Sequence, residues 1–320
     1  MGDVDVVVLF EHPEWQKPLF EALEARGLSY EAFDLKRGAF DPRRLPAARV
    51  VFNQASPSAY VRHHERAVPL ARTLLRSYSA AGIPVVNGDE AFSLELSKAA
   101  QLALMERIGV RAPRSVVFDD VEALADRLRR TEFPFPALIK PDQGGSGARM
   151  VEVSSLDAVR QAVAGPELWS PDPVLILQEK LQYDPEFGIV RIEIVGGELL
   201  YAMRVVAHGG FNLCPSEVCH PTAGLSGACA ARPPEAPRVE FHPYPEVPDR
   251  AVADALRVAR AGGLDIAGLE YALVDGEPVF YDVNANSNLR PAVAAAFGIA
   301  NPFARVVDYL ERRMVRARAA

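Results

Sequence analysis

The sequence predicts an α/β fold in which a small parallel-sheet domain over residues 1–90 precedes two α+β subdomains, over 91–182 and 183–320. Three observations lead to this prediction. Apolar, β-rich runs alternate with helical segments in the first of these parts, which is typical of βαβ units. Later β-rich runs come in pairs joined by glycine-containing turns, as in antiparallel hairpins. At 320 residues, 49% of them hydrophobic, the chain can build two or three packed cores.

The N-terminal part shows the clearest alternation of strands and helices. Residues 4–10 (VDVVVLF) predict a buried strand, and apolar residues then recur at helical spacing from Trp15 to a stop at Gly27. Further strands are expected at 29–35, 49–53 and 84–87, with a long helical segment at 60–81. Because parallel sheets bind ligands beyond the carboxyl ends of their strands, three polar residues after the third strand are candidate substrate contacts, or simple loop caps: Asn53, Gln54 and Ser56.

The remaining elements follow from the same patterns. Part 91–182 is expected to hold a helix with Lys98, strands at 115–118 and 174–179, helices at 120–130 and 155–164, and a hairpin around a glycine-rich loop. Part 183–320 is expected to hold strands at 187–195 and 198–206, a helix at 249–261, a second hairpin and a terminal helix at 302–317. Residues 207–248, rich in glycine and proline, are predicted to be a long loop that serves as a lid or binding element.

Composition excludes several classes of protein. A net charge of −7 and a pI near 5.5 argue against a nucleic-acid surface. No apolar run approaches the roughly 18–20 residues that span a bilayer, and the N-terminus lacks the basic region of a signal peptide. Three cysteines make no disulfide framework. A zinc site is one interpretation of Cys214, Cys219, His220 and Cys229, but their spacing matches no usual pattern, so buried thiols are favoured. A cytoplasmic protein is expected.

The strongest chemical signal is the segment GLEYALVDGEPVFYDVNAN, residues 268–286. Its Asp-Gly pair is typical of a hairpin turn, and folding about it places Glu270 opposite, or one residue away from, Asp282. Asn284 shares the face of Asp282, because side chains two apart on a strand do. Adjacent carboxylates repel each other, and such oxygen ligands suit Mg²⁺ or Mn²⁺ and not zinc. The alternative is a hairpin with a solvated polar face.

A glycine-rich loop supplies a second signal. Residues 133–150 (FPFPALIKPDQGGSGARM) read as a strand ending in Lys140, a loop and another strand; the loop residues are Gly144, Gly145, Ser146 and Gly147. Glycines let backbone N–H groups approach an anion, and a lysine beside them supplies a point charge for phosphate. The spacing is neither a Walker A nor a Rossmann motif. An ordinary hairpin turn would explain the loop taken alone.

Taken in order, these segments resemble the ATP-grasp superfamily, and more closely its glutathione-synthetase and RimK-like carboxylate–amine ligase branch. The resemblance runs from about Lys98 to Asn284 and implies two subdomains that clamp ATP. In LSKAAQLALMERIGVRAP it gives Lys98 a phosphate-binding role, beside Lys140 and the glycine loop. In VLILQEKL it assigns the adenine side to Glu179, Lys180 and Leu181, with Glu186 on the ribose. Glu270, Asp282 and Asn284 would hold two Mg²⁺ or Mn²⁺ ions.

The sequence also departs from the family pattern. Family members often continue the ligand asparagine with a Pro-Gly turn, whereas here Ala285 follows, which puts the acceptor pocket in doubt. Position 270 carries Glu where close relatives often have Asp. Three arginines are candidates for binding phosphate or a substrate carboxylate, since a guanidinium suits both: Arg191, Arg204 and Arg290. A solvated strand face is the alternative for Arg191 and Arg204.

The resemblance implies an ATP-dependent ligase. A carboxylate would take the γ-phosphoryl group to give an acyl phosphate, and an amine would then form an amide or peptide bond. The expected partners are small-molecule or peptide carboxylates and amines, with neither nucleic acid nor membrane, and possible homodimers. Two alternatives stay open: an ATP-grasp small-molecule kinase acting on a hydroxyl, and a non-catalytic ATP-binding subunit.

Overall fold

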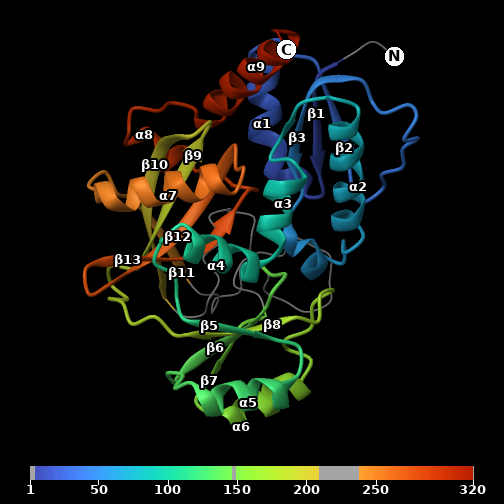
Figure 1. Ribbon diagram of the computed structural model, residues 1–320. Helices are drawn as coiled ribbons and strands as arrows, with labels where there is room; N and C mark the ends of the chain where they lie inside the picture. The colour runs from blue at the N-terminus through green and yellow to red at the C-terminus, as the bar shows by residue number, and fades with distance from the viewer. Residues whose placement is uncertain (1–3, 146–148, 209–237, 320) are drawn as a thin grey trace.

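The computed structural model describes residues 4–145, 149–208 and 238–319 and arranges them around three sheets that follow one another along the chain (Figure 1). The first is a parallel sheet of four strands in the order β2-β1-β3-β4. The second is antiparallel, in the order β5-β8-β6-β7, and the third is antiparallel, in the order β11-β10-β9-β12-β13. The predicted fold class, a small parallel sheet followed by two α+β units, is confirmed.

The first sheet and its helices largely follow the alternation that the sequence predicts, although the third helix was not predicted. Its strands are β1 (Val4–Phe10), β2 (Tyr30–Asp34), β3 (Ala48–Gln54) and β4 (Val85–Val86), and its helices are α1 (Pro13–Ala25), α2 (Ala67–Ala80) and α3 (Asp89–Leu96). The single helix predicted at 60–81 is wrong at its start. A short 3₁₀ helix, η1 (Pro57–Arg62), precedes α2 and ends at His63, whose φ of 62° is left-handed and interrupts helical backbone.

The middle sheet carries the glycine-rich loop. Its elements are β5 (Ser115–Phe118), α5 (Val121–Arg130), β6 (Ala137–Pro141), β7 (Val151–Val153), α6 (Leu156–Ala164) and β8 (Leu175–Glu179). Helices α5 and α6 cover one face (Figure 1), and apolar side chains such as Leu124, Ile139 and Val159 form the core between them and the sheet. The opposite face, with Lys140 and Gln178, is left for the cavity described below.

The third sheet holds the metal-type hairpin. Its elements are β9 (Ile189–Val195), β10 (Glu198–His208), β11 (Arg238–Pro243), α7 (Asp249–Ala261), β12 (Ile266–Val274), β13 (Glu277–Asn284), α8 (Pro291–Ala295) and α9 (Pro302–Ala319). The loop predicted at 207–248 is wrong at both ends, because β10 continues to His208 and pairs antiparallel with β11. Residues 209–237 lie outside the described residues, and so do the zinc candidates Cys214, Cys219, His220 and Cys229.

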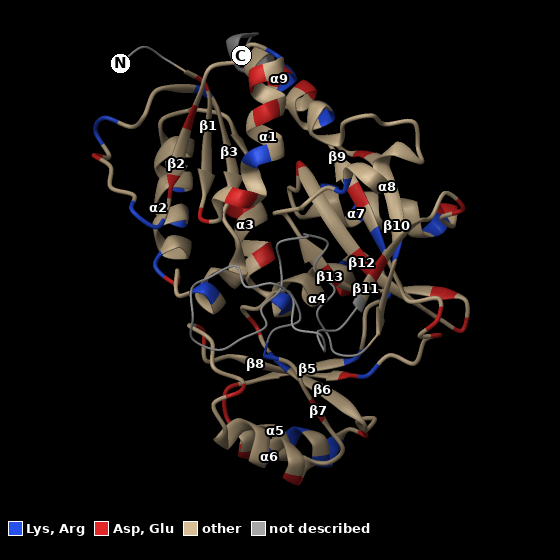
Figure 2. Ribbon diagram, turned by 180° about the vertical axis from the view of Figure 1, so that it is seen from behind, with Lys and Arg blue, Asp and Glu red and all other residues tan. Residues whose placement is uncertain are grey.

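The first and last helices of the described chain lie side by side (Figure 1). Helices α1 and α9 pack against each other, and α9 also contacts β3 and β9, so the first and third sheets share one apolar core. On the far side of the third sheet, α7 packs beside α4 (Lys98–Arg107). No helix of the described chain is long and apolar enough to cross a membrane. Positions of Lys and Arg alternate along the ribbon with positions of Asp and Glu, as the colours in Figure 2 show.

Asn87 joins the first sheet to the hairpin of the third. Its Oδ1 accepts from the backbone N–H groups of Asp265 and Ile266 at 2.9 and 3.1 Å, and its Nδ2 donates to the carbonyls of Ile266 and Ala285 at 2.9 and 2.7 Å. Its φ of 52° is one that asparagine tolerates better than most residues. This buried side chain therefore holds the start of β12 and the end of β13 against the loop after β4.

Candidate active site

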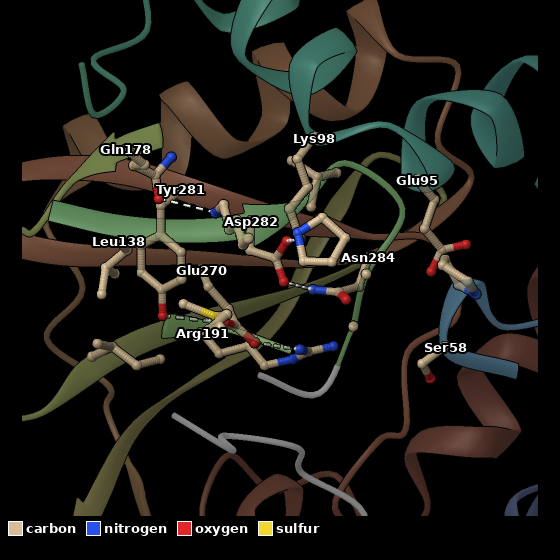
Figure 3. A pocket seen from close by; sticks show the side chains of 18 of the residues that line it. Ser58, Glu95, Lys98, Leu138, Gln178, Arg191, Glu270, Tyr281, Asp282 and Asn284 are labelled. Atoms are coloured by element: carbon tan, nitrogen blue, oxygen red, sulfur yellow. Dashed lines mark hydrogen bonds and ion pairs between the residues drawn. The ribbon is translucent and has the colours of Figure 1, made fainter. Parts of the chain in front are cut away.

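A cavity of about 220 Å³ opens between the middle and third sheets, beside the end of the first (Figure 3). It brings together segments that are far apart in the sequence. The wall formed by the middle sheet includes Lys140 and Gln178, the wall formed by the third sheet includes Glu270 and Asp282, and Ser58 comes from the first domain. Of the predicted site residues, those that line the cavity are Lys98, Lys140, Gly144, Gly145, Glu179, Lys180, Leu181, Arg191, Glu270, Asp282 and Asn284.

The β12–β13 hairpin turns as its sequence predicts. Asp275 and Gly276 have φ values of 55° and 79°, and the strands pair so that Glu270 lies opposite Asp282. The register shifts next to this pair, so Tyr281 is an extra residue on β13. Without that shift, Tyr281 itself would lie opposite Glu270. The bulge therefore brings both Tyr281 and Asp282 to the same glutamate.

Glu270 is held by two donors. Arg191 Nη1 donates to its Oε1 at 2.7 Å, and the Tyr281 hydroxyl donates to its Oε2 at 3.1 Å. Burial raises the pKa of Glu270, and the charge of Arg191 opposes that rise. Arg191 is itself buried. Its Nε donates to Glu193 at 2.6 Å, and its Nη2 donates to Ser287 at 3.0 Å. The guanidinium thus bridges the buried carboxylates of Glu193 and Glu270 at the wall of the cavity.

Gly268 makes room for that guanidinium. A Cβ added at position 268 would lie 2.5 Å from Arg191 Cζ and 2.7 Å from its Nε, far inside van der Waals contact. Gly268 sits on β12 opposite Asn284 and next to Glu193 of β9. The glycine of the GLEY segment is therefore explained by close approach of a side chain and not by a turn.

Asp282 is the second carboxylate of the hairpin. It forms an ion pair with Lys98, and Asn284 Nδ2 donates to its Oδ2 at 3.2 Å. Burial by itself raises the pKa of Asp282, but the charges of Lys98 and Lys140 outweigh burial and hold that pKa below its ordinary value. Asp282 therefore stays ionised next to Glu270.

Lys98 owes its position to a capped helix start. It is the first residue of α4, and the N-cap Ser97 accepts from the backbone N–H of Ala100 at 3.0 Å. Asp142, just after β6, accepts from the backbone N–H of Ala99 at 2.7 Å through its carboxylate. This contact fastens the start of the glycine-rich loop to the helix that carries Lys98.

Lys140 lies deep in the wall formed by the middle sheet. It is 3% exposed, and its Nζ donates to Gln178 Oε1 at 2.9 Å. Burial, with the nearby charge of Lys98, lowers the pKa of Lys140 to about 7. An anion in the cavity would restore the charge of this lysine. Both lysines thus line the same cavity as the two carboxylates, and Figure 3 shows Lys98 beside Asp282.

Several predicted residues lie elsewhere. Glu186 is exposed and does not line the cavity. Neither does Arg204, which donates to the Phe187 carbonyl at 3.4 Å and stacks over that ring. Arg290 lies over the Phe241 ring, 3.9 Å from its centroid, and is also absent from the lining. Ser146 and Gly147 are outside the described residues. Ser56 is the one residue of the Asn53, Gln54 and Ser56 group that lines the cavity.

The donor set of the hairpin suits a hard divalent cation. In the described part of the chain, no three His, Cys, Asp or Glu side chains gather into a metal site. A cation here would be held by the carboxylates of Glu270 and Asp282 and by the amide oxygen of Asn284. That amide oxygen makes no hydrogen bond among the described residues, because only Nδ2 of Asn284 is engaged. Three oxygen donors fit Mg²⁺ or Mn²⁺.

Some site residues carry no sequence signal of their own. Glu95 lies in DEAFSLEL, which reads as an ordinary helix, yet it is 4% exposed and lines the cavity. Glu193 and Ser287 contribute only through Arg191. Gln178 lies within the strand VLILQE. The alternation of a strand predicts which face of the sheet its side chain is on, but not that it bonds to a lysine.

Of the comparisons with known proteins, the one with solved structures identifies a fold. No family model and no curated protein matches the sequence. Solved structures match along almost the whole chain. ATP-grasp ligase PsnB, complexed with a minimal precursor, is 20% identical over 97% of this chain and 99% of that chain, with a TM-score of 0.64. A RimK domain ATP-grasp protein from Sphaerobacter thermophilus is 17% identical over 95% and 98%, with a TM-score of 0.67. D-alanine–D-alanine ligase from Bacillus anthracis is 14% identical over 99% of each chain, with a TM-score of 0.68. These matches show a shared fold.

Proposed function

From its ATP-grasp fold, we propose that this protein is an ATP- and Mg²⁺-dependent carboxylate–amine ligase that forms an amide or peptide bond through an acyl phosphate. One observation carries the proposal. A single cavity is lined by two buried lysines and by a hairpin with two carboxylates and an amide, and the glycine-rich loop begins at its edge. This is the set of groups that binds and transfers a metal-bound phosphoryl group.

Three groups of residues would bind the phosphates, the base and the metal. Lys98 and Lys140 would offset the charge of the ATP phosphates, together with N–H groups of the loop that starts at Gly144 and Gly145. Glu179, Lys180 and Leu181, at the end of β8, would contact the base. Glu270, Asp282 and Asn284 would hold Mg²⁺ or Mn²⁺, which when bound neutralises charge on the phosphates.

The proposed reaction has two steps. A carboxylate oxygen of the substrate attacks the γ-phosphorus, and ADP leaves with the electron pair of the broken P–O bond. A neutral amine then attacks the acyl carbon, so that a C–N bond forms and the C–O bond to phosphate breaks. Phosphate leaves with that electron pair and takes up the proton that the nitrogen loses. Arg191, the arginine that lines the cavity in the described chain, would hold Glu270 in place during both steps.

Substrate size and the division of the chain are also proposals. PsnB was solved with a precursor peptide, whereas D-alanine–D-alanine ligase is named for amino acids, so both peptide and small-molecule substrates fit proteins of this fold. We assign nucleotide binding mainly to residues 91–182, metal binding to 183–320, and substrate contacts to the edge of 1–90.

The test is ADP release by the purified protein with Mg²⁺·ATP against pooled carboxylates and pooled amines. Asp282→Ala should abolish release, and Asp157→Ala, an exposed aspartate on α6, is the matched control. Release that needs both an acid and an amine supports the ligase. Release with hydroxyl compounds alone would identify a kinase. ATP binding without turnover on any pool would contradict the proposal and favour a non-catalytic subunit.

A further inference from the structure

Among the residues that the structure describes, the end of the cavity nearest the first sheet contains two buried oxygen atoms without a hydrogen-bond donor. Glu95, near the end of α3, is 4% exposed, and its Oε1 accepts from the backbone N–H of Asn286 at 2.9 Å. Its other oxygen, Oε2, has no hydrogen bond to any described residue. A buried carboxylate oxygen without a donor is costly, so a native structure that keeps one calls for an explanation.

Asn286 supplies the second acceptor. Its Nδ2 donates to the Gln54 carbonyl at 2.8 Å, while its Oδ1 is buried without a partner in the described part of the chain. The orientation of this amide is determined by that contact, because the flipped amide would set oxygen against the carbonyl oxygen. The wall therefore offers two oxygen acceptors from Glu95 and Asn286, which are held together by the hydrogen bond from the Asn286 backbone N–H to the Glu95 carboxylate.

The charges around the cavity leave Glu95 without an ion-pair partner among the described residues. Asp282 pairs with Lys98, and Glu270 pairs with Arg191. Burial raises the pKa of Glu95 to about 8; the charge of Asp282 adds to the rise, and the charge of Lys98 opposes it. A positive ligand group beside Oε2 would favour the charged carboxylate.

The location of these acceptors fits the second substrate of the proposed ligase. Glu95 comes three residues before Lys98, and Asn286 comes two residues after Asn284, so both adjoin the phosphate and metal groups. Figure 3 shows Glu95 and Ser58 on the same side of the cavity, away from Gln178 at the nucleotide side. A nitrogen that attacks an acyl phosphate must approach from outside the phosphate site, and this wall borders that approach.

We propose that Glu95 Oε2 and Asn286 Oδ1 form an ammonium-binding subsite that receives the amine substrate in its cationic form. An ammonium group carries several N–H donors and a positive charge, which both oxygens accept and one carboxylate neutralises. The inference rests on the proposed ligase function and names the substrate class of its second site: a primary amine that is cationic at neutral pH.

A kinetic test compares two nucleophiles of different charge. Glycinamide is cationic near pH 7, whereas hydroxylamine is largely neutral, and both can attack an acyl phosphate. Glu95→Gln keeps the shape and removes the charge. It should raise the half-saturating concentration of glycinamide by about tenfold or more, since losing one partner of a buried charged pair weakens binding by at least that much. The values for hydroxylamine and Mg²⁺·ATP should stay within about twofold.

The matched control is Glu90→Gln, which makes the same chemical change at an exposed position of the same helix and should alter neither nucleophile. Asn286→Ala is a second variant that removes only the neutral acceptor and should weaken glycinamide in the same direction. Equal losses for glycinamide and hydroxylamine in Glu95→Gln would overturn the proposal, because a merely structural role cannot separate the two nucleophiles.

A binding test does not depend on turnover. With Mg²⁺ and a non-hydrolysable ATP analogue, glycinamide should raise the thermal midpoint of the wild-type protein by about 1–2 °C over KCl at equal ionic strength. Glu95→Gln should lose this rise and Glu90→Gln should keep it. No rise in the wild-type protein, or an equal rise with KCl, would overturn the ammonium subsite. If no carboxylate supports ADP release, the ligase fails while this binding test still decides the subsite.

Discussion

Replacing Gly268 with alanine tests whether Arg191 organises the carboxylates of the site. The backbone of β12 accepts alanine, but the new Cβ would lie 2.5 Å from Arg191 Cζ. Since non-bonded carbon atoms keep roughly 3.5 Å apart, the guanidinium must move by about 1 Å. Its contacts to Glu193, Glu270 and Ser287, at 2.6, 2.7 and 3.0 Å, cannot all survive that movement.

The expected cost follows from two opposing effects. Breaking a buried ion pair costs about 3–5 kcal/mol, because a buried charge loses its partner. Alanine in a strand recovers about 0.5–1 kcal/mol relative to glycine through the lower entropy of the unfolded chain. Gly268→Ala should therefore lower the free energy of unfolding by about 2–4 kcal/mol, measured by urea denaturation followed by circular dichroism.

Two comparisons isolate the cause. Gly88→Ala, where the nearest atom would be 3.8 Å away, should cost less than about 1 kcal/mol. In an Arg191→Met background the guanidinium is absent, so Gly268→Ala should add less than about 1 kcal/mol. Two results would refute this explanation: Gly268→Ala lowers the free energy of unfolding equally in both backgrounds, or it changes that free energy in neither. In either case, close approach of Arg191 is not the reason for a glycine at position 268.

Three further predictions concern buried polar groups. The Lys140 pKa falls from 10.5 to about 7 on folding, so between these pH values the unfolded chain binds more protons than the folded protein. The free energy of unfolding of the wild type should therefore rise with pH relative to that of Lys140→Met. The rise should approach about 1.4 kcal/mol per pH unit in urea unfolding from pH 6.5 to 9. Asn87→Ala, which breaks four hydrogen bonds, should cost about 3–5 kcal/mol, against about 1 kcal/mol for the helix cap Asn301→Ala. Tyr281→Phe should cost about 1–2 kcal/mol because a buried carboxylate loses its donor, and Tyr30→Phe, at an exposed contact, less than about 0.5 kcal/mol.

Each of these has a result that would contradict it. A difference between wild type and Lys140→Met that does not change with pH would mean that the lysine keeps its proton in the folded protein. Equal costs for Asn87→Ala and Asn301→Ala would mean that the buried asparagine does not join the two sheets. Equal costs for the two tyrosine variants would mean that the Glu270 contact adds nothing to folding.

How much could be predicted depended on how local the determining interactions are. The hairpin of Glu270 and Asp282 was within reach, because an Asp-Gly turn and the two-residue period of a strand set its register. The bulge at Tyr281 was not, since it depends on which donors surround Glu270 in the folded protein. The loop predicted at 207–248 failed at its ends because glycine and proline content cannot show that β10 finds a partner in β11.

The site residues, too, could be predicted only where local sequence determines them. Lys98 and Lys140 could be proposed from motif order, yet their burial and the lowered pKa of Lys140 arise only where two sheets enclose them. Glu95 was not predicted as a site residue, and its interest comes from its contact with Asn286, 191 positions away in the chain.

By itself, the sequence determined the fold class, most of the strands and helices and the oxygen-rich hairpin, because periodicity and turn chemistry act over a few residues. Only the tertiary structure decided which charges meet. Arg191 turned toward Glu193 and Glu270, Lys98 toward Asp282, and Glu95 has no ion-pair partner among the described residues, since these pairings depend on how distant elements pack and how much water they exclude.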